Sequence, residues 1–339
     1  MEVSKRQSAP EAAPVSPRLL EPDGGGVREV EFPSWNPYLP HDMQREDIRN
    51  RRFQARGRLF LPDARFPRPR PAVVIVQGLS GPRKEREIAY GHFLARNGYV
   101  ALMTDSFGSR GLGNAIQIWR ALRVTTAMLM ADTFGALDYL AAHPQVSRGK
   151  IGVVGFSFGG MISVLTAYRR IHDLYLPGGP AFAAHVSYYG SSIPRLEDPA
   201  TAGAPVFMML GTRDGNVSIP RSEQIAGDLR RGGSAVDLSI FDAFHQWDGP
   251  YRKPHRIFFH LRGCHIRIGN DGSVTDEKSG HQIRGPWSRL WFLLRNSVPA
   301  GYLEQRDPEL VEKTNGLLLS FLEKAFSRQR ARARAGPGP

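Results

Sequence analysis

The chain has 339 residues, of which 41% are hydrophobic and 23% charged, a composition that excludes collagen-like and wholly disordered proteins. Its formal net charge of +13 includes arginine clusters at residues 49–58 and 328–334. No nucleic-acid-binding module stands between these clusters, so we expect no nucleic-acid partner. No apolar run approaches the roughly 18–20 residues of a membrane-spanning helix, so we expect no membrane partner either.

Cys264 is the only cysteine, so neither an intramolecular disulfide nor a CxxC metal or redox pair can form. The first residues run into Ala- and Pro-rich sequence without the apolar segment of a secretory signal. We therefore expect a cytoplasmic protein whose fold depends on no oxidising compartment.

The first 30 residues are rich in Pro, Ala, Ser and Gly, and they are predicted to form a disordered arm. Short apolar runs then alternate with helical patterns. We predict strands at residues 53–61, 71–76, 99–105, 150–156, 184–189, 205–211 and 236–241, and helices at 83–97, 119–143, 158–170, 218–231 and 307–328. This alternation predicts one α/β domain over residues 31–328, with a mostly parallel central sheet and helices on both faces. The basic residues 329–339 are predicted to be a disordered tail.

An insertion at about residues 251–297 interrupts this alternation before the last helix. Residues 264–268 and 273–275 flank an Asp-Gly turn and predict a small β-hairpin, and residues 287–294 predict a short helix. The insertion either shapes a substrate pocket at one end of the sheet or packs as a surface excursion.

The sharpest motif is Gly155-Phe156-Ser157-Phe158-Gly159, between a predicted strand and a predicted helix. A serine hydroxyl is a weak nucleophile, and it needs exposure and a nearby base. A tight strand-to-helix turn supplies the exposure, and it requires small residues two positions before and two after the serine. We therefore predict Ser157 to be a catalytic nucleophile.

The partners expected for such a serine are an acid and then a histidine, in that chain order. Asp214 follows the predicted strand at residues 205–211, and His245 follows the strand at 236–241, so both are expected at the carboxyl edge of the sheet beside Ser157. Three other carboxylates are rivals for the acid. They are Asp198 in a Pro-flanked loop, Asp228 inside a helix, and Asp242 close to the histidine in the chain.

An oxyanion hole needs two preorganised donors. We predict the backbone N–H of Phe158, after the nucleophile, and that of Leu79, in the loop after the strand at 71–76. Arg110 follows the strand at 99–105 at the same edge. It either binds an anionic group of the substrate or bonds loop carbonyls.

The remaining downstream histidines have a spacing that matches no zinc motif. They are His255, His260, His265 and His281, all in the insertion. We expect no metal and no cofactor.

Several stretches resemble the dienelactone hydrolase branch of the α/β-hydrolases. They are PAVVIVQGLSGP, NGYVALMTDSFGSRG, LDYLAAHPQVSRGKIGVVGFSFGG, GTRDGNV and FHQWD, in order within residues 53–250. The resemblance implies the α/β-hydrolase fold and an ester or lactone substrate. The founding enzymes carry a cysteine where this chain has Ser157, and a glutamate where it has Gly78. These departures favour a general serine esterase over the namesake reaction.

The expected function is hydrolysis of a small-molecule carboxylic ester or lactone through an acyl-enzyme on Ser157. A thioesterase, a peptidase or a transacylase on the same three residues remains an alternative, because fold and triad do not separate them. A non-catalytic binding protein on a hydrolase scaffold is the third hypothesis. The sequence gives neither the substrate nor the oligomeric state.

Overall fold

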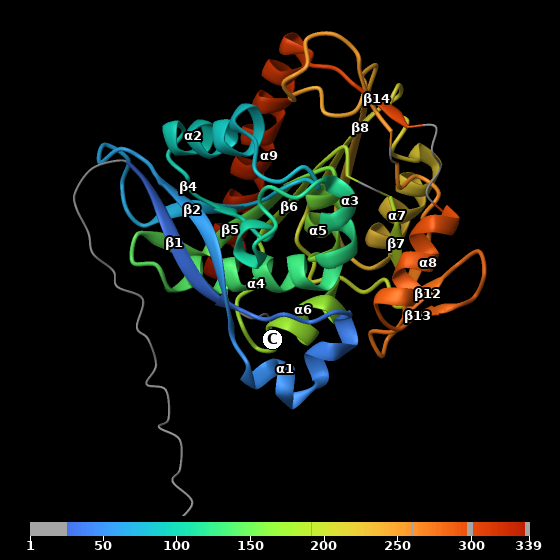
Figure 1. Ribbon diagram of the computed structural model, residues 1–339. Coiled ribbons are helices and arrows are strands. Elements are labelled where there is room, and N and C mark those ends of the chain that lie inside the picture. The colour runs from blue at the N-terminus through green and yellow to red at the C-terminus, as the bar shows by residue number, and fades with distance from the viewer. Residues whose placement is uncertain (1–25, 191, 259, 297–300, 336–339) are drawn as a thin grey trace, which may run out of the picture.

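A computed structural model describes residues 26–335, except for residues 191, 259 and 297–300. Eight strands form the central sheet in the order β1-β2-β4-β3-β5-β6-β8-β9 (Figure 1). They are β1 (Gly26–Ser34), β2 (Phe53–Leu61), β3 (Arg70–Val76), β4 (Val100–Thr104), β5 (Val146–Phe156), β6 (Ala184–Tyr188), β8 (Val206–Gly211) and β9 (Val236–Phe241). The pairs β1–β2 and β2–β4 are antiparallel, and the other strands are parallel.

The inner strands are buried on both faces because their side chains alternate between two hydrophobic cores. In β3, Val74 and Val76 pack into one core, while Val73 and Ile75 pack into the other. This explains why the run PAVVIV contains no polar residue. The expected α/β fold with a mostly parallel sheet is confirmed.

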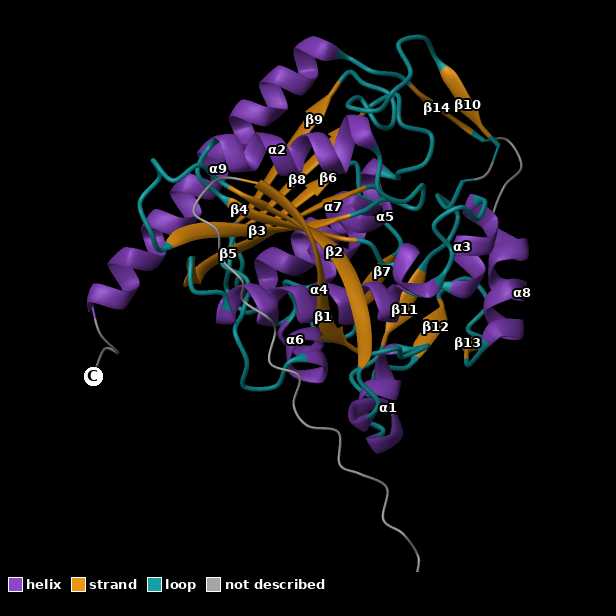
Figure 2. Ribbon diagram, turned by 60° about the vertical axis from the view of Figure 1, so that its left-hand side comes forward, coloured by secondary structure: helices purple, strands orange, loops and turns teal. Residues whose placement is uncertain are grey.

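Helices cover both faces of the sheet (Figure 2). On one face lie α4 (Thr126–Ala142), α5 (Phe158–Leu165), α6 (Arg169–Tyr175) and α7 (Ile219–Arg231). On the other lie α2 (Ala89–Arg96) and α9 (Pro308–Ala335). Among the described residues, no helix is both long enough and apolar enough to cross a bilayer.

Three predicted helices are interrupted. The helix predicted at residues 119–143 is divided into α3 (Gln117–Arg123) and α4, because Thr125 caps α4 by accepting the Met128 N–H at 3.2 Å. The helix predicted at 158–170 is divided into α5 and α6. The helix predicted at 83–97 begins with a π-helical turn, η2 (Lys84–Ile88), before α2. The N-terminal connection adds η1 (Pro40–Gln44) and α1 (Glu46–Asn50), and η3 (Gly108–Arg110) follows β4.

The structure describes a part of each predicted disordered end, and that part belongs to a regular element. Residues 26–30, assigned to the arm, form the first half of β1, which pairs with β2 along its whole length. Residues 329–335, assigned to the tail, continue α9. Residues 1–25 and 336–339 lie outside the described part of the chain.

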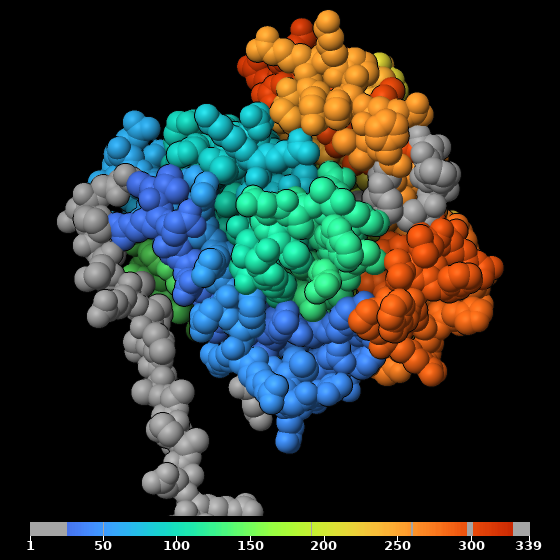
Figure 3. Space-filling view, viewed as in Figure 1, coloured from blue at the N-terminus to red at the C-terminus, as the bar shows by residue number. Residues whose placement is uncertain are grey.

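The insertion contains the expected hairpin, formed by β11 (Ile266–Ile268) and β12 (Val274–Asp276). Strand β13 (Gln282–Ile283) extends it on one side, and β7 (Pro194–Leu196) joins it on the other. Helix α8 (Pro286–Asn296) follows, and β10 (His255–Ile257) pairs with β14 (Tyr302–Glu304). In Figure 3 the insertion, in orange, flanks one side of the body beside the blue N-terminal segment.

Candidate active site

Ser157 occupies the turn between β5 and α5, with φ 53° and ψ −113°. A positive φ is strained for a residue with a side chain, and such strain is found at functional sites. Neighbouring glycines allow the turn, since a Cβ on Gly155 would lie 1.9 Å from the Gly159 carbonyl oxygen, and one on Gly159 would lie 2.2 Å from that of Val76. The Ser157 N–H donates to the Tyr188 carbonyl at 2.9 Å. The sequence requirement for small residues therefore has a direct steric cause.

The structure brings Ser157, His245 and Asp214 into one hydrogen-bonded chain. Ser157 Oγ lies 2.8 Å from His245 Nε2, and His245 Nδ1 lies 2.6 Å from Asp214 Oδ2. The three residues are buried, with 6%, 0% and 5% of their surface exposed. Because the Asp214 carboxylate only accepts, it favours the tautomer with hydrogen on Nδ1, which leaves Nε2 free to accept the serine proton.

Backbone amides hold the Asp214 carboxylate in place. Its Oδ1 accepts the N–H groups of Asn216 at 2.8 Å and Val217 at 3.2 Å. Because Oδ1 is used in this way, Oδ2 is directed at His245.

The rival carboxylates have other partners. Asp228 pairs with Arg195 at 2.6 Å and also with Arg231. Asp242 pairs with Arg213 at 2.8 Å and its side chain is 77% exposed. Asp198 accepts a hydrogen bond from the N–H of Ala200, within its own loop. Asp214 is the carboxylate that contacts His245.

A small pocket surrounds Ser157. It is lined by Leu79, Ser80, Gln117, Ser157, Phe158, Asn216, Gln246, Leu261 and Tyr302. Phe158 is the first residue of α5, where helical N–H groups have no intrahelical partner. Leu79 faces the same pocket from the loop after β3. Both predicted oxyanion donors thus belong to residues that line the pocket of the nucleophile.

Aromatic rings enclose the imidazole of His245. The rings of Tyr189 and Tyr302 each lie edge-on to it, with centroids 4.9 Å away. Burial raises the pKa of both phenols well above the ordinary value, so both remain protonated donors. Tyr189 donates to Asp248, and Tyr302 donates to Glu304 at 3.4 Å.

A buried polar network lies behind the histidine, and sequence reasoning missed it. Gln246, at φ 54°, donates to Glu304 and accepts from Arg86. Arg86 also donates to Ser80 Oγ at 3.1 Å and pairs with Glu87 at 2.7 Å, with both side chains of this pair fully buried. Of these residues, only Gln246 could have been found from the sequence, because it directly follows His245. Arg86, Glu87 and Glu304 lie far from His245 in the chain.

Gly78, which replaces the family's glutamate in the resemblance, makes room for this network. A Cβ at position 78 would lie 2.9 Å from Arg86 Nη2. The Gly78 N–H donates to Glu87 Oε1 at 3.1 Å, so a carboxylate from η2 reaches this position instead. Burial by itself would lower the pKa of Arg86. The electrostatic effect of Glu87, together with that of Tyr189 and Asp248, is larger and opposite, so the Arg86 pKa is raised above its ordinary value.

Arg110 is not among the residues that line the pocket of Ser157. Its guanidinium pairs with Asp132 at 2.6 Å and donates to Asn36 Oδ1 at 2.9 Å and to the Ser106 carbonyl at 3.0 Å. The Phe53 ring packs against it at 4.4 Å. These contacts favour the alternative in which Arg110 has a structural role, because the guanidinium joins the N-terminal segment to η3 and α4.

Within the described residues, no three His, Cys, Asp or Glu side chains are grouped as metal ligands would be. The insertion histidines lie in different surroundings. Partial burial lowers the pKa of His260 and of His265, while His255 stacks on Tyr251 with ring centroids 3.8 Å apart.

Comparison with known proteins identifies the family of this chain. The model of the dienelactone hydrolase family matches residues 55–257, more than half of the chain. The chain belongs to the dienelactone hydrolase family. It is 26% identical to the carboxymethylenebutenolidase of Pseudomonas putida over 171 residues, which cover 46% of this chain and 66% of that enzyme.

The fold is shared with a solved structure of low sequence identity. The structure named m3DLH has a TM-score of 0.51 at 19% identity, over 80% of this chain and 97% of the other. A dienelactone hydrolase-like promiscuous phosphotriesterase, P91, from metagenomic libraries has a TM-score of 0.48 at 20% identity, over 67% and 86%. Dienelactone hydrolase family membership makes this chain a hydrolase of ester or lactone bonds.

Proposed function

We propose that the chain hydrolyses a carboxylic ester or lactone through an acyl-enzyme on Ser157. The observation that carries the proposal is the continuous hydrogen-bonded chain from Ser157 Oγ through His245 to Asp214 Oδ2. A buried serine that is bonded to a histidine, which is itself oriented by a carboxylate, is the arrangement that activates a hydroxyl for acyl transfer.

In the first half-reaction Ser157 Oγ attacks the carbonyl carbon while its proton passes to His245 Nε2. The carbonyl oxygen becomes an oxyanion, which the backbone N–H groups of Leu79 and Phe158 stabilise. Losing one such donor typically costs about 3 kcal/mol of barrier. The ester C–O bond then breaks, and His245 returns the proton to the leaving oxygen.

In the second half-reaction water replaces the alcohol. His245 takes a proton from the water as its oxygen attacks the acyl-enzyme, and the bond to Ser157 Oγ breaks. The proton returns to Ser157, and the free acid leaves. Asp214 stabilises the imidazolium in both halves without becoming protonated.

The test is hydrolysis of p-nitrophenyl acetate by Ser157→Ala, with Ser163→Ala as control. Ser163 lies on the same helix, but its hydroxyl donates to the Gly160 and Val186 carbonyls, both at 2.8 Å. We expect Ser157→Ala to lose turnover and Ser163→Ala to keep it. Unchanged turnover in Ser157→Ala would refute the nucleophile.

A fluorophosphonate probe tests the same site without a substrate. The intact protein should gain the probe's mass on Ser157, whereas a non-catalytic scaffold would remain unlabelled. A panel of esters, lactones, thioesters and peptide amides then separates an esterase from a thioesterase, peptidase or transacylase.

A further inference from the structure

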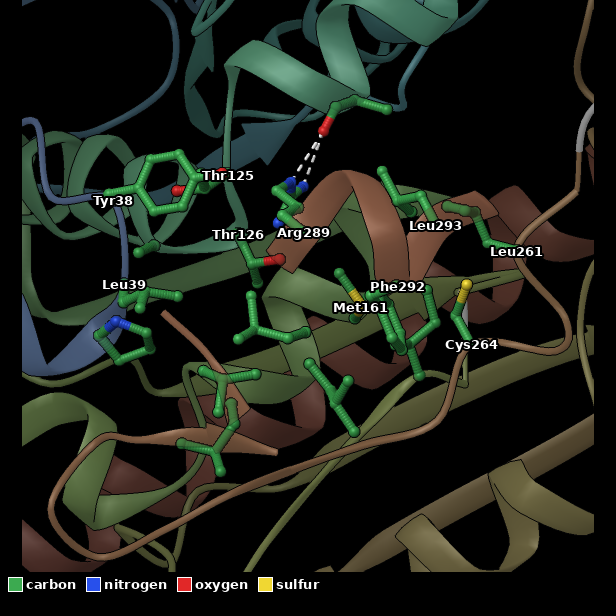
Figure 4. Close-up of a pocket in the computed structure, with 18 of the residues that line it drawn as sticks. Tyr38, Leu39, Thr125, Thr126, Met161, Leu261, Cys264, Arg289, Phe292 and Leu293 are labelled. Atoms are coloured by element: carbon green, nitrogen blue, oxygen red, sulfur yellow. Dashed lines mark hydrogen bonds between the residues drawn. The ribbon is translucent and has the colours of Figure 1, made fainter. Parts of the chain in front are cut away.

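A second, apolar cavity of about 60 Å³ adjoins the pocket of Ser157, and we name it the side cavity (Figure 4). Nine of its 19 lining residues belong to the insertion at 251–297. The rest come from the N-terminal segment, from α3, from α4 and its cap Thr125, and from residues 158, 161 and 193. The segment that interrupts the α/β alternation therefore contributes about half of the wall of the side cavity.

Two residues, Phe158 and Leu261, line both the side cavity and the pocket of Ser157. Phe158 directly follows the nucleophile, and Leu261 comes from the insertion. These two residues are a wall that both spaces share, and we name this wall the partition. A substrate group attached to the carbonyl carbon at Ser157 therefore lies close to the side cavity.

Most of the residues that line the side cavity are apolar. Phe292 and Leu293 present the inner face of α8 and are 8% and 6% exposed, whereas their neighbour Trp291 points outward and is 63% exposed. Burial raises the pKa of the Cys264 thiol to about 12, so this side chain stays uncharged.

One cation, Arg289, also lines the side cavity, and it lies between Tyr38 and Leu293 in the view of Figure 4. Its Nε and Nη2 donate to the Ala121 carbonyl at 3.0 and 2.8 Å. Burial lowers its pKa. The guanidinium therefore joins α8 to α3, while Leu261, Met161 and Phe292 contribute apolar side chains to the wall.

We propose that the side cavity binds the acyl chain of the ester that Ser157 attacks, and that this chain is neutral, apolar and about four to six carbons long. The proposal rests on the proposed function. A cavity of about 150 Å³ can hold benzene, so one of about 60 Å³ holds roughly two to three carbons. The carbonyl carbon and the next one or two carbons of the acyl chain lie in the pocket of Ser157 and beside the partition.

The first measurement is the kcat/KM of the full chain for p-nitrophenyl acetate, butyrate, hexanoate, octanoate and decanoate. We expect a maximum at butyrate or hexanoate, about tenfold above acetate, since two buried methylenes are worth about that factor. The p-nitrophenyl monoester of adipic acid should be poorer than the hexanoate. A flat profile, or a preference for the anionic monoester, would overturn the proposal.

Two variants of the cavity wall test its location. Ala127→Val adds two carbons to a 1%-exposed lining residue, and should lower the ratio of hexanoate to acetate kcat/KM about tenfold. Phe292→Ala enlarges the side cavity and should move the maximum to octanoate or longer. Trp291→Ala, the adjacent outward residue of α8, is the matched control and should leave the profile in place.

The outcomes separate this proposal from the catalytic one. Hydrolysis that survives Ser157→Ala refutes the catalytic proposal whatever the chain-length profile. A different outcome refutes only the proposal for the side cavity. In that outcome hydrolysis depends on Ser157, but the chain-length profile is the same in the wild type, Ala127→Val and Phe292→Ala. Phe292→Ala only removes atoms, so it keeps the test open if Ala127→Val fails to fold.

Discussion

At the scale of single residues, the site depends on how Asp214 divides its two oxygens. Oδ1 is held by the Asn216 and Val217 amides, and Oδ2 is left for His245. The chain order predicted the acid and the base, but two Asx-type bonds decide which oxygen faces the imidazole.

Asp214→Asn should lower kcat/KM for p-nitrophenyl acetate by roughly 10²–10⁴-fold. An amide nitrogen facing His245 Nδ1 removes the acceptor, so the imidazole takes the wrong tautomer and cannot accept from Ser157. Asp242→Asn is the matched control, because that side chain is 77% exposed and pairs with Arg213. If the two variants are equally active, Asp214 is not the orienting acid.

At the scale of elements, η2 connects the oxyanion loop to the histidine loop. Its Arg86 reaches Ser80, beside Leu79, and Gln246, beside His245, while Glu87 holds the Gly78 amide. The helical pattern at 83–97 was visible in the sequence. The π-helical turn was not visible in the sequence. It places the adjacent side chains of Arg86 and Glu87 in a buried space, and that space is formed by other elements of the fold.

Arg86→Met should reduce the free energy of unfolding by about 3–5 kcal/mol, since it leaves the buried Glu87 carboxylate without its cation. Glu85→Gln, on the exposed side of the same turn, should change it by less than about 0.5 kcal/mol. Urea unfolding of the two variants measures the difference. A loss below about 1 kcal/mol for Arg86→Met would mean that the pair is not part of the folded core.

At the scale of the whole molecule, the core holds a histidine that has no role in the site. His185 on β6 is 1% exposed, and its Nδ1 lies 3.0 Å from the Ser163 carbonyl and 3.1 Å from Thr166 Oγ1. Burial lowers the pKa of His185 to about 4 from the ordinary 6.5. At a pH between these two values, His185 is mostly protonated in the unfolded chain and mostly neutral in the folded protein.

Stability should therefore fall as the pH drops from about 6.5 to about 4, by up to roughly 3 kcal/mol from His185 alone. His185→Asn keeps a donor for the Ser163 carbonyl but cannot ionise. Its free energy of unfolding should decline less steeply over that range than that of the wild type. Parallel curves would show that His185 does not titrate in this way.

The sequence by itself determined the alternating α/β architecture and the turn at Ser157. It also determined the order of Asp214 and His245, since strand patterns and glycine spacing are local properties. Only the tertiary structure decided that Arg110 pairs with Asp132, that Arg86 and Glu304 bond to Gln246 beside the histidine, and that the insertion lines a mostly apolar cavity. Each of these contacts joins residues far apart in the chain. No local pattern of side chains specifies such a pairing, because it depends on where the completed sheet places its loops.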